Sequence, residues 1–194
     1  MAPEVRCDWC GDDPLYVDYH DREWGVPSHD DRHLFEMLLL EGAQAGLAWI
    51  TILRKREGYR QALCGFDPER IAAFTDADQA RLREDAGIVR NRLKIASAVR
   101  NARAWLQLVN ERGSFTDYLW DFVDGVPVQN TFRTMAEIPA STPLSDRLSK
   151  DLKQRGFNFV GSTIVYAYMQ SVGLVNDHVV DCFRHREVQR RGAV

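Results

Sequence analysis

Apolar residues recur at helical spacing along most of the chain. From residue 31 they follow one another three or four positions apart, on a stripe that holds Leu34, Met37, Leu38 and Ala45. This spacing is the period of one helical face. The longest such stripe runs over residues 90–111, and no segment shows the strict alternation of a half-buried strand. The sequence therefore predicts an all-α protein.

Start and stop signals divide this pattern into separate helices. Proline is favoured at the first helical position, so Asp67-Pro68 indicates an N-terminus. Thr75 is a second N-terminal signal, because its side chain can cap free backbone amides. The predicted helices cover residues 31–45, 49–63, 75–87, 90–111, 115–123, 145–154 and 160–172, with a short helix after Asp67.

Two segments lack this pattern. Residues 1–30 show little helical periodicity but hold four aromatic side chains, which predicts an arm packed against the rest of the protein. Residues 124–144 hold three of the seven prolines and predict a long connection. We expect one unit, built from the arm (1–30), a helical body (31–144), a C-terminal helix pair with its following segment (145–182) and a tail (183–194).

Composition excludes some classes of protein. A net charge of −3 argues against coating nucleic acid by bulk electrostatics, although 25 Lys and Arg residues leave room for a local basic face. No apolar run approaches the roughly 20 residues that span a bilayer, and the N-terminus does not resemble a secretory signal. We expect a cytoplasmic protein without a membrane partner. Its four cysteines are then metal ligands or free thiols.

A glycine-containing turn lies between the last two predicted helices. Gly156 suits a left-handed helix cap, and Gly161 allows close approach of a partner. Ser162 and Thr163 then open the next helix, whose free amides and dipole favour an anion. Three basic residues precede the turn, at positions 150, 153 and 155. The turn predicts a contact with a phosphate backbone, the alternative being a simple helix connection.

Cysteine and histidine residues near both ends predict a metal site. His178 and Cys182 are four residues apart, so on a helix they would face the same way. Cys7, Cys10 and His20 in the arm are possible complements. Zinc in structural sites takes four nitrogen or sulfur ligands. Spacing alone leaves open whether Cys10 or His20 completes the set, and whether the residues are connected at all.

Glu41 interrupts an apolar helix stripe. A buried carboxylate is costly unless it is paired or meets a polar ligand. The alternative is a carboxylate at a helix end that reaches solvent. The following turn leads through Leu47 to Trp49. Together with the aromatic residues of the arm, this indicates a flat slot with an acceptor at its end, suited to an electron-poor ring with an exocyclic amine.

Five stretches together resemble the 3-methyladenine DNA glycosylase I family, a branch of the helix-hairpin-helix glycosylases. They are CDWCGDDPLYVDYHDREWGVP, LFEMLLLEGAQAGLAWITILRKR, AGIVRNRLKI, SDRLSKDLKQRGFNFVGSTI and GLVNDHVVDC. They occur in order across nearly the whole chain, from about Cys7 to Cys182, and the tail from Phe183 to Val194 is not covered. The resemblance implies an all-α helix-hairpin-helix fold in which a structural zinc joins the N- and C-terminal segments.

The resemblance also assigns roles to single residues. The implied zinc ligands are Cys7, His20, His178 and Cys182, which leaves Cys10 as a departure. Glu41 is the implied catalytic, base-contacting acid. The implied substrate-binding aromatic residues are Trp9, Tyr16, Tyr19, Trp24 and Trp49. The implied DNA contacts are the turn of Gly46 and Leu47, which enters the gap left by an extruded base, and the hairpin residues Gly156, Phe159, Gly161, Ser162 and Thr163.

The implied activity is excision of 3-methyladenine from alkylated double-stranded DNA by hydrolysis of the N-glycosidic bond. Methylation makes the base cationic, so the charge of Glu41 is expected to favour it. We expect no lyase activity, and we interpret Asp177 as the N-cap of a terminal helix and not as a catalytic group. We expect a monomer that associates with the nucleoid when bound to DNA. The alternative is a non-catalytic, zinc-stabilised helix-hairpin-helix DNA-binding protein.

Overall fold

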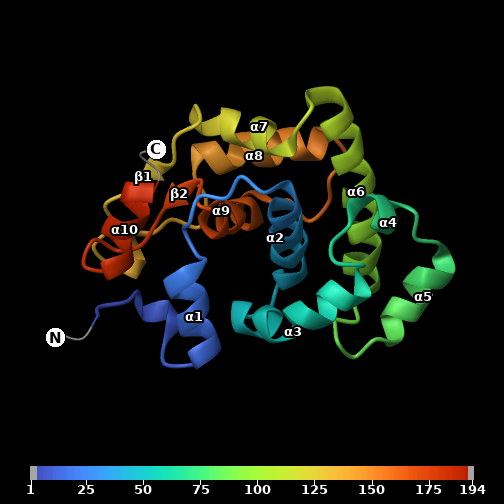
Figure 1. Cartoon of the computed structure of the whole chain (residues 1–194), viewed down its shortest axis with the longest axis horizontal. Helices are drawn as coiled ribbons and strands as arrows, with labels where there is room; N and C mark the ends of the chain where they lie inside the picture. Colours follow the sequence, from blue (N-terminus) through green and yellow to red (C-terminus); the bar gives the residue numbers. More distant parts are fainter. Residues whose placement is uncertain (1–3, 192–194) are drawn as a thin grey trace.

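The computed structural model describes residues 4–191. The chain is mostly helical there, as the sequence predicted (Figure 1). The α-helices are α1 (Pro14–Arg22), α2 (Asp31–Gln44), α3 (Trp49–Ala62), α4 (Pro68–Ala72), α5 (Asp76–Glu84), α6 (Arg92–Arg112), α7 (Phe115–Trp120), α8 (Pro143–Gln154), α9 (Ser162–Ser171) and α10 (Phe183–Arg191). Short 3-10 turns occur at η1 (Asp8–Cys10), η2 (Asp121–Val123) and η3 (Met135–Glu137).

The helix starts follow from local capping chemistry. The Asp67 side chain accepts hydrogen bonds from the amides of Glu69 and Arg70 and so begins α4. Thr75 and Asp78 exchange side-chain and backbone hydrogen bonds at the start of α5, which is a capping box. Both starts were predicted, the first from Asp67-Pro68 and the second from Thr75. The predicted helices 31–45, 49–63 and 90–111 correspond to α2, α3 and α6 within two or three residues.

Some elements were not predicted. The arm contains α1, whose start is set by Pro14 and by the Asp13 side chain, which caps the amide of Leu15. Two-residue strands β1 (Val128–Gln129) and β2 (Val175–Asn176) pair in parallel. Such short segments have too few residues to show a period. The tail forms α10 as far as Arg191, and residues 192–194 lie outside the described range.

The terminal segment corrects two expectations. His178 and Cys182 do not lie on a helix but in the turn between β2 and α10. Asp177 is therefore not the N-cap of the terminal helix, because α10 begins only at Phe183. Their spacing of four matched a helical turn, and the sequence pattern did not distinguish that helix from a compact loop.

Helix α2 lies at the centre of the fold. It packs against α3, α6, α7 and α9, and Figure 1 shows it between α3 on one side and the α7–α8 pair on the other. Its residues 34–43 are all buried. Helices α1 and α10 lie at the same end of the molecule, where the amide of Phe183, at the start of α10, donates to the carbonyl of Val5 in the segment before α1. No helix in the described range is long and apolar enough to cross a membrane.

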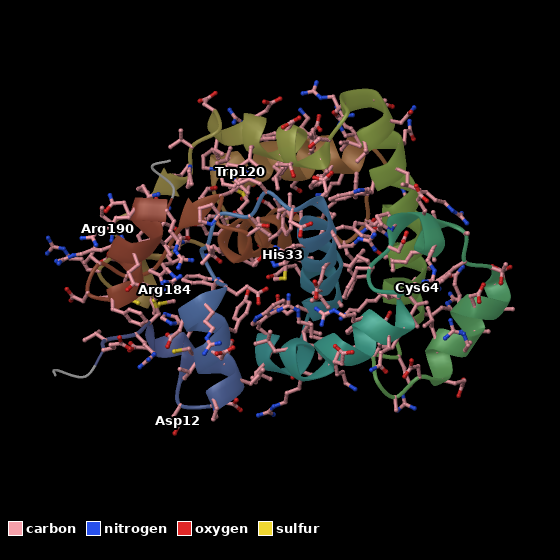
Figure 2. All side chains as sticks on the ribbon, viewed as in Figure 1. Asp12, His33, Cys64, Trp120, Arg184 and Arg190 are labelled. Carbon is pink, nitrogen blue, oxygen red and sulfur yellow. The ribbon has the colours of Figure 1, made fainter. Side chains whose placement is uncertain are left out.

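A network of charged side chains fixes α2 against α3 and the end of α1. Arg56 on α3 donates to Glu36 on α2 at 2.7 Å and to Glu23 after α1 at 2.7 Å. Arg60 also donates to Glu36, at 2.8 Å. His33, which Figure 2 labels on α2, contacts Glu23 at 3.1 Å. Although burial raises the pKa of Glu23, hydrogen bonds from His33 and Arg56 lower it to about 2.

We expect Arg56→Met to destabilise the protein by about 2–3 kcal/mol, somewhat less than for a fully buried pair, because Glu36 and Glu23 lose their shared partner. The folded-state pKa of Glu23 lies below its ordinary value, so this stability is present above about pH 5 and is lost as the pH falls towards 2. Urea unfolding at pH 7 and pH 3 measures the difference. Arg22→Met, which removes an exposed pair with Asp18, is the control and should change stability by less than about 0.5 kcal/mol. Equal effects of the two substitutions would contradict the prediction.

Candidate functional site

A cavity of about 370 Å³ opens between the arm, α2, α3, α9 and the connection before α8. Its volume lies in the range of small-molecule sites. The six residues expected to bind substrate all line it: Trp9, Tyr16, Tyr19, Trp24, Glu41 and Trp49. The structure therefore brings together side chains from positions 9 to 49, as the flat slot inferred from the sequence requires.

Aromatic rings form one wall of the cavity and support one another. Trp9 packs edge-on against Tyr16, with ring centroids 4.9 Å apart, and against Trp24 at 5.0 Å. Tyr19 lies 5.5 Å from Trp49. Edge-to-face packing of this kind holds large side chains in fixed orientations. The wall offers flat apolar faces on which a planar ring can stack.

Two polar atoms in this wall lack a partner. The indole nitrogens of Trp9 and Trp49 are buried, and neither donates a hydrogen bond to another described residue. An unpaired buried donor costs roughly 1–3 kcal/mol, so such atoms are uncommon in folded proteins. The wall therefore contains two buried donors that no described protein group satisfies.

Glu41 is the acidic group of the cavity. It is only 4% exposed, although it lies on the same helix as the apolar core. Burial raises the pKa of Glu41 to about 8, with a smaller opposing effect from Ser171. The carboxyl group of the free protein is therefore mostly protonated near neutrality. From the sequence we expected a permanent negative charge on Glu41 to select the ligand. With the raised pKa, Glu41 instead loses its proton when a cationic ligand enters the cavity.

The other side of the cavity was not anticipated. Thr163, Tyr166 and Gln170 recur at helical spacing along one face of α9, and Met135, Ile138, Pro139 and Ala140 line the cavity from the connection. Thr163 was expected at a DNA contact, and the others were not singled out. The one signal for residues 135–140 in the sequence was a cluster of apolar residues in a segment otherwise typical of a loop.

The four expected metal ligands meet at one point. Potential ligand atoms of Cys7, His20, His178 and Cys182 lie within 4.8 Å of one another, and all four residues are buried. The thiol of Cys182 is 3.5 Å from Nε2 of His20 and 3.6 Å from Nδ1 of His178. Cys10 is also buried, but its thiol donates to the carbonyl of Cys7 instead. The cluster could hold a metal ion. Its fourth residue is His20 and not Cys10.

Neighbouring groups orient both imidazoles towards the thiols. Nδ1 of His20 lies 2.8 Å from Asp21, which in turn accepts hydrogen bonds from Nε and Nη2 of Arg6. Nε2 of His178 lies 3.0 Å from the carbonyl of Trp24. Each ring can donate its proton outward and keep the lone pair of its other nitrogen for a metal. Such outer partners are typical of metal-binding histidines.

The two thiols share one environment. The hydrogen bond with Cys182, together with burial, raises the pKa of Cys7. Hydrogen bonds from Cys7 and from the two histidines lower the pKa of Cys182. One thiolate is thus already favoured in the cluster. A bound cation would favour both, because a coordinating thiol is deprotonated.

The cluster directly supports the cavity wall. The ring of His178 lies 4.6 Å from the ring of Trp24, and that of His20 lies 5.3 Å from the ring of Trp9. Both tryptophans line the cavity. The arm is thus held at residues that are in contact with the aromatic wall.

The expected DNA contacts lie on two turns. Gly46 has φ +77° and precedes Leu47, which is 38% exposed beside the cavity residues Gln44 and Trp49. Gly156 has φ +93°, in the left-handed conformation expected of a helix cap. Phe159 also has a positive φ, of 54°, and packs against Gly42. Gly161 is the N-cap of α9, and a Cβ atom there would meet no heavy atom within 4 Å.

The two residues that open α9 differ in their surroundings. The hydroxyl of Ser162 donates to Asp146 and contacts Ser145, so it is engaged within the protein. Thr163 lines the cavity. A phosphate group at this helix end would therefore meet backbone amides and not the serine hydroxyl.

Comparison with known proteins gives matches over almost the whole chain. A family model described as methyladenine glycosylase matches residues 9–185. DNA-3-methyladenine glycosylase 1 of Escherichia coli is 55% identical over 177 residues, covering 91% of this chain and 95% of that protein. DNA-3-methyladenine glycosylase of Haemophilus influenzae is 47% identical, with 92% and 96% covered.

Solved structures agree with these matches. A crystal structure of 3-methyladenine DNA glycosylase I superposes with a TM-score of 0.91 at 55% identity, covering 92% of this chain and 98% of that one. A structure of the enzyme from Staphylococcus aureus, which concerns recognition of 3-methyladenine, gives 0.89 at 38% identity, with 92% and 95% covered.

We expect Glu41→Gln to stabilise the protein increasingly as the pH rises. The folded-state pKa of Glu41, about 8, exceeds its ordinary value of 4.5, so its stabilising contribution is present at low pH and is lost as the pH rises to 8. Glutamine avoids this loss. Each unit of pKa difference corresponds to about 1.4 kcal/mol, which predicts a gap of a few kcal/mol at pH 8. Urea unfolding of both proteins between pH 5 and pH 9 measures it, and a gap independent of pH would contradict the prediction.

Proposed function

The chain belongs to the methyladenine glycosylase family, and on that premise we propose that it removes 3-methyladenine from alkylated double-stranded DNA. The reaction is hydrolysis of the N-glycosidic bond, as part of base-excision repair. The observation that carries this proposal is the cavity of flat aromatic faces with the buried carboxyl of Glu41 among its lining residues. Such a cavity suits a planar base that is turned out of the duplex.

Selection of the base follows from charge and shape. A base inside a duplex must be extruded, which costs a few kcal/mol and less for a damaged base. An adenine methylated at N3 is cationic, so it stacks well on the aromatic wall. Its charge would displace the proton of Glu41, whose pKa burial has raised to about 8. The resulting carboxylate would accept hydrogen bonds from the base edge. A neutral base in the duplex would not offset the cost of burying the charged carboxylate.

The same cationic charge makes the base a good leaving group. The protein then needs to hold the base and to support the positive charge that moves to the sugar as the neutral base leaves, more than it needs a strong nucleophile. Among the described residues that line the cavity there is no lysine, the side chain whose amine would attack the sugar in a lyase step. We therefore propose a monofunctional glycosylase in which water is the nucleophile.

We further propose that α8, the turn after it and α9 form a helix-hairpin-helix unit that holds the DNA backbone. Gly156, Phe159 and Gly161 shape the turn, and the amides of Ser162 and Thr163 lie at the N-terminus of α9, where a helix dipole favours a phosphate. Gly46 and Leu47 would occupy the gap that the extruded base leaves. In this proposal one copy of the chain acts on one site, in the cytoplasm and at the nucleoid when bound to DNA.

We propose zinc as the metal of the four-residue cluster. Two thiolates and two imidazoles are a ligand set that zinc takes in structural sites. Cys7 and His20 would contribute from the arm, and His178 and Cys182 from the segment before α10. With four protein ligands no position remains for an activated water, so the ion would supply cohesion and no chemistry.

Release of bases from methylated DNA tests the function. We expect free 3-methyladenine to be released with the abasic strand left uncut. Release of no 3-methyladenine would favour the alternative, a zinc-stabilised DNA-binding protein without catalysis. Strand cleavage in the absence of added alkali would contradict the monofunctional assignment.

In the same assay we expect Glu41→Gln to lower kcat/KM at least about tenfold, because it removes an acceptor that becomes charged. The wild-type kcat/KM should rise with pH and level off near the pKa of Glu41, about 8. The variant should lack this rise. Weaker binding of free 3-methyladenine should accompany the loss, and unchanged binding would remove Glu41 from the site.

Metal analysis tests the ligand set. We expect Cys7→Ser to lose bound zinc, because serine is a poor zinc ligand, and to unfold more easily. Cys10→Ser is the matched control, since Cys10 is equally buried but bonds to a carbonyl. It should retain about one zinc per chain in elemental analysis. Retention of zinc by the first variant, or its loss from the second, would contradict the assignment.

A further inference from the structure

Asp177 is a buried carboxylate that faces three hydrogen-bond donors. It is 1% exposed. Its Oδ1 accepts a hydrogen bond from Asn130 at 2.6 Å. Its Oδ2 accepts one from Gln170 at 2.7 Å and another from the hydroxyl of Tyr166. A carboxylate removed from water needs such donors, so the three groups and Asp177 fix one another.

Two of these donors belong to the cavity. Tyr166 and Gln170 lie on α9, one helical turn apart, and both line the cavity. Asp177 is not among the lining residues, so it acts from behind the wall. It therefore has no direct access to a bound base or to an attacking water in this arrangement.

The bonds to Asp177 determine what the α9 side can offer a ligand. The single proton of the Tyr166 hydroxyl is committed to Asp177, which leaves the oxygen only acceptor capacity. The amide nitrogen of Gln170 is the end that faces Asp177, so its carbonyl oxygen is turned elsewhere. An electron-poor base with an exocyclic amine presents donors, and an acceptor-rich wall suits it.

Asp177 also joins this wall to the connection that covers it. Asn130 follows β1, which pairs with β2 immediately before Asp177. The amide of Val180 donates to the carbonyl of Phe132, so the pairing continues past the carboxylate. The segment that begins here supplies Met135 and Ile138 to the cavity. One carboxylate thus connects two sides of the cavity.

We propose that Asp177 is a positioning residue for base recognition: it orients Tyr166 and Gln170 so that the α9 side of the cavity accepts hydrogen bonds from the bound base. This proposal rests on the proposed function. It assigns Asp177 no contact with the reacting atoms, and it predicts that the residue acts through Tyr166.

The test compares Asp177→Asn, Tyr166→Phe and the double variant in binding of free 3-methyladenine, followed by quenching of tryptophan fluorescence. We expect each single substitution to raise Kd about tenfold, the effect of about one lost hydrogen bond. The Kd of the double variant should not exceed the higher Kd of the two single variants, because both substitutions break the same hydrogen bond between Tyr166 and Asp177. KM for methylated DNA should rise similarly, while kcat stays within about threefold.

Tyr118→Phe provides a matched control. The hydroxyl of Tyr118 donates to Asp151 at 2.7 Å, so the substitution removes the same type of bond away from the cavity. It should lower stability and leave Kd unchanged. Metal content and thermal unfolding of every variant show whether the fold is retained. If Asp177→Asn does not fold, Tyr166→Phe against Tyr118→Phe decides, because only the former should weaken binding.

Two results would overturn the proposal. One is an unchanged Kd in a folded Asp177→Asn or Tyr166→Phe variant. The other is an increase in the Kd of the double variant that equals the product of the two single increases, which would mean that Asp177 does not act through Tyr166. In both cases wild-type protein still binds the base and excises it. Failure of the wild type itself would instead overturn the proposed function, and this proposal with it.

Discussion

The contact between Cys7, His20, His178 and Cys182 is the constraint on which the rest of the site depends. It joins residues 171 positions apart in the chain and lies directly behind Trp9 and Trp24. The arm has little apolar periodicity of its own, and α1 is only 9 residues long. A helix of that length is marginal in isolation. Its position, and with it the aromatic wall, follows from the cluster, the charged network at Glu23 and packing against Trp49.

The cavity, in contrast, contains buried groups that make the fold less stable. Glu41 is placed where its charged form is disfavoured, and two indole donors remain unpaired nearby. A core selected for stability alone would contain apolar groups there. A buried carboxyl group whose pKa is raised by burial is typical of functional sites. Arg56 bonds α3 to Glu36 on α2, and Asp177 accepts hydrogen bonds from Tyr166 and Gln170 on α9, so the helices around these groups are tied to their neighbours.

Much of the fold could be predicted from local chemistry. Asp67, Thr75 and the long stripe of α6 set helix boundaries through capping and period, which act within a few residues. The clustering of Cys7 with Cys182 could be suggested only from residue type and resemblance, because spacing says nothing about contacts across the chain. Tyr166, Gln170 and the 135–140 segment were missed since their roles arise from packing. The loop that carries His178 was mistaken for a helix because both place residues four apart together.

The distance along the chain between the two halves of the cluster has a consequence for synthesis on the ribosome. The aromatic wall needs residues near position 7, and His178, which helps to hold it in place, emerges 171 residues after Cys7. Helices α2 to α9 can pack beforehand through contacts closer in sequence, which form sooner than distant ones. A nascent chain that stops short of Cys182 would contain the helical body and an arm that the complete cluster does not yet hold in place. The protein thus completes its base-selecting surface only after Cys182 has emerged.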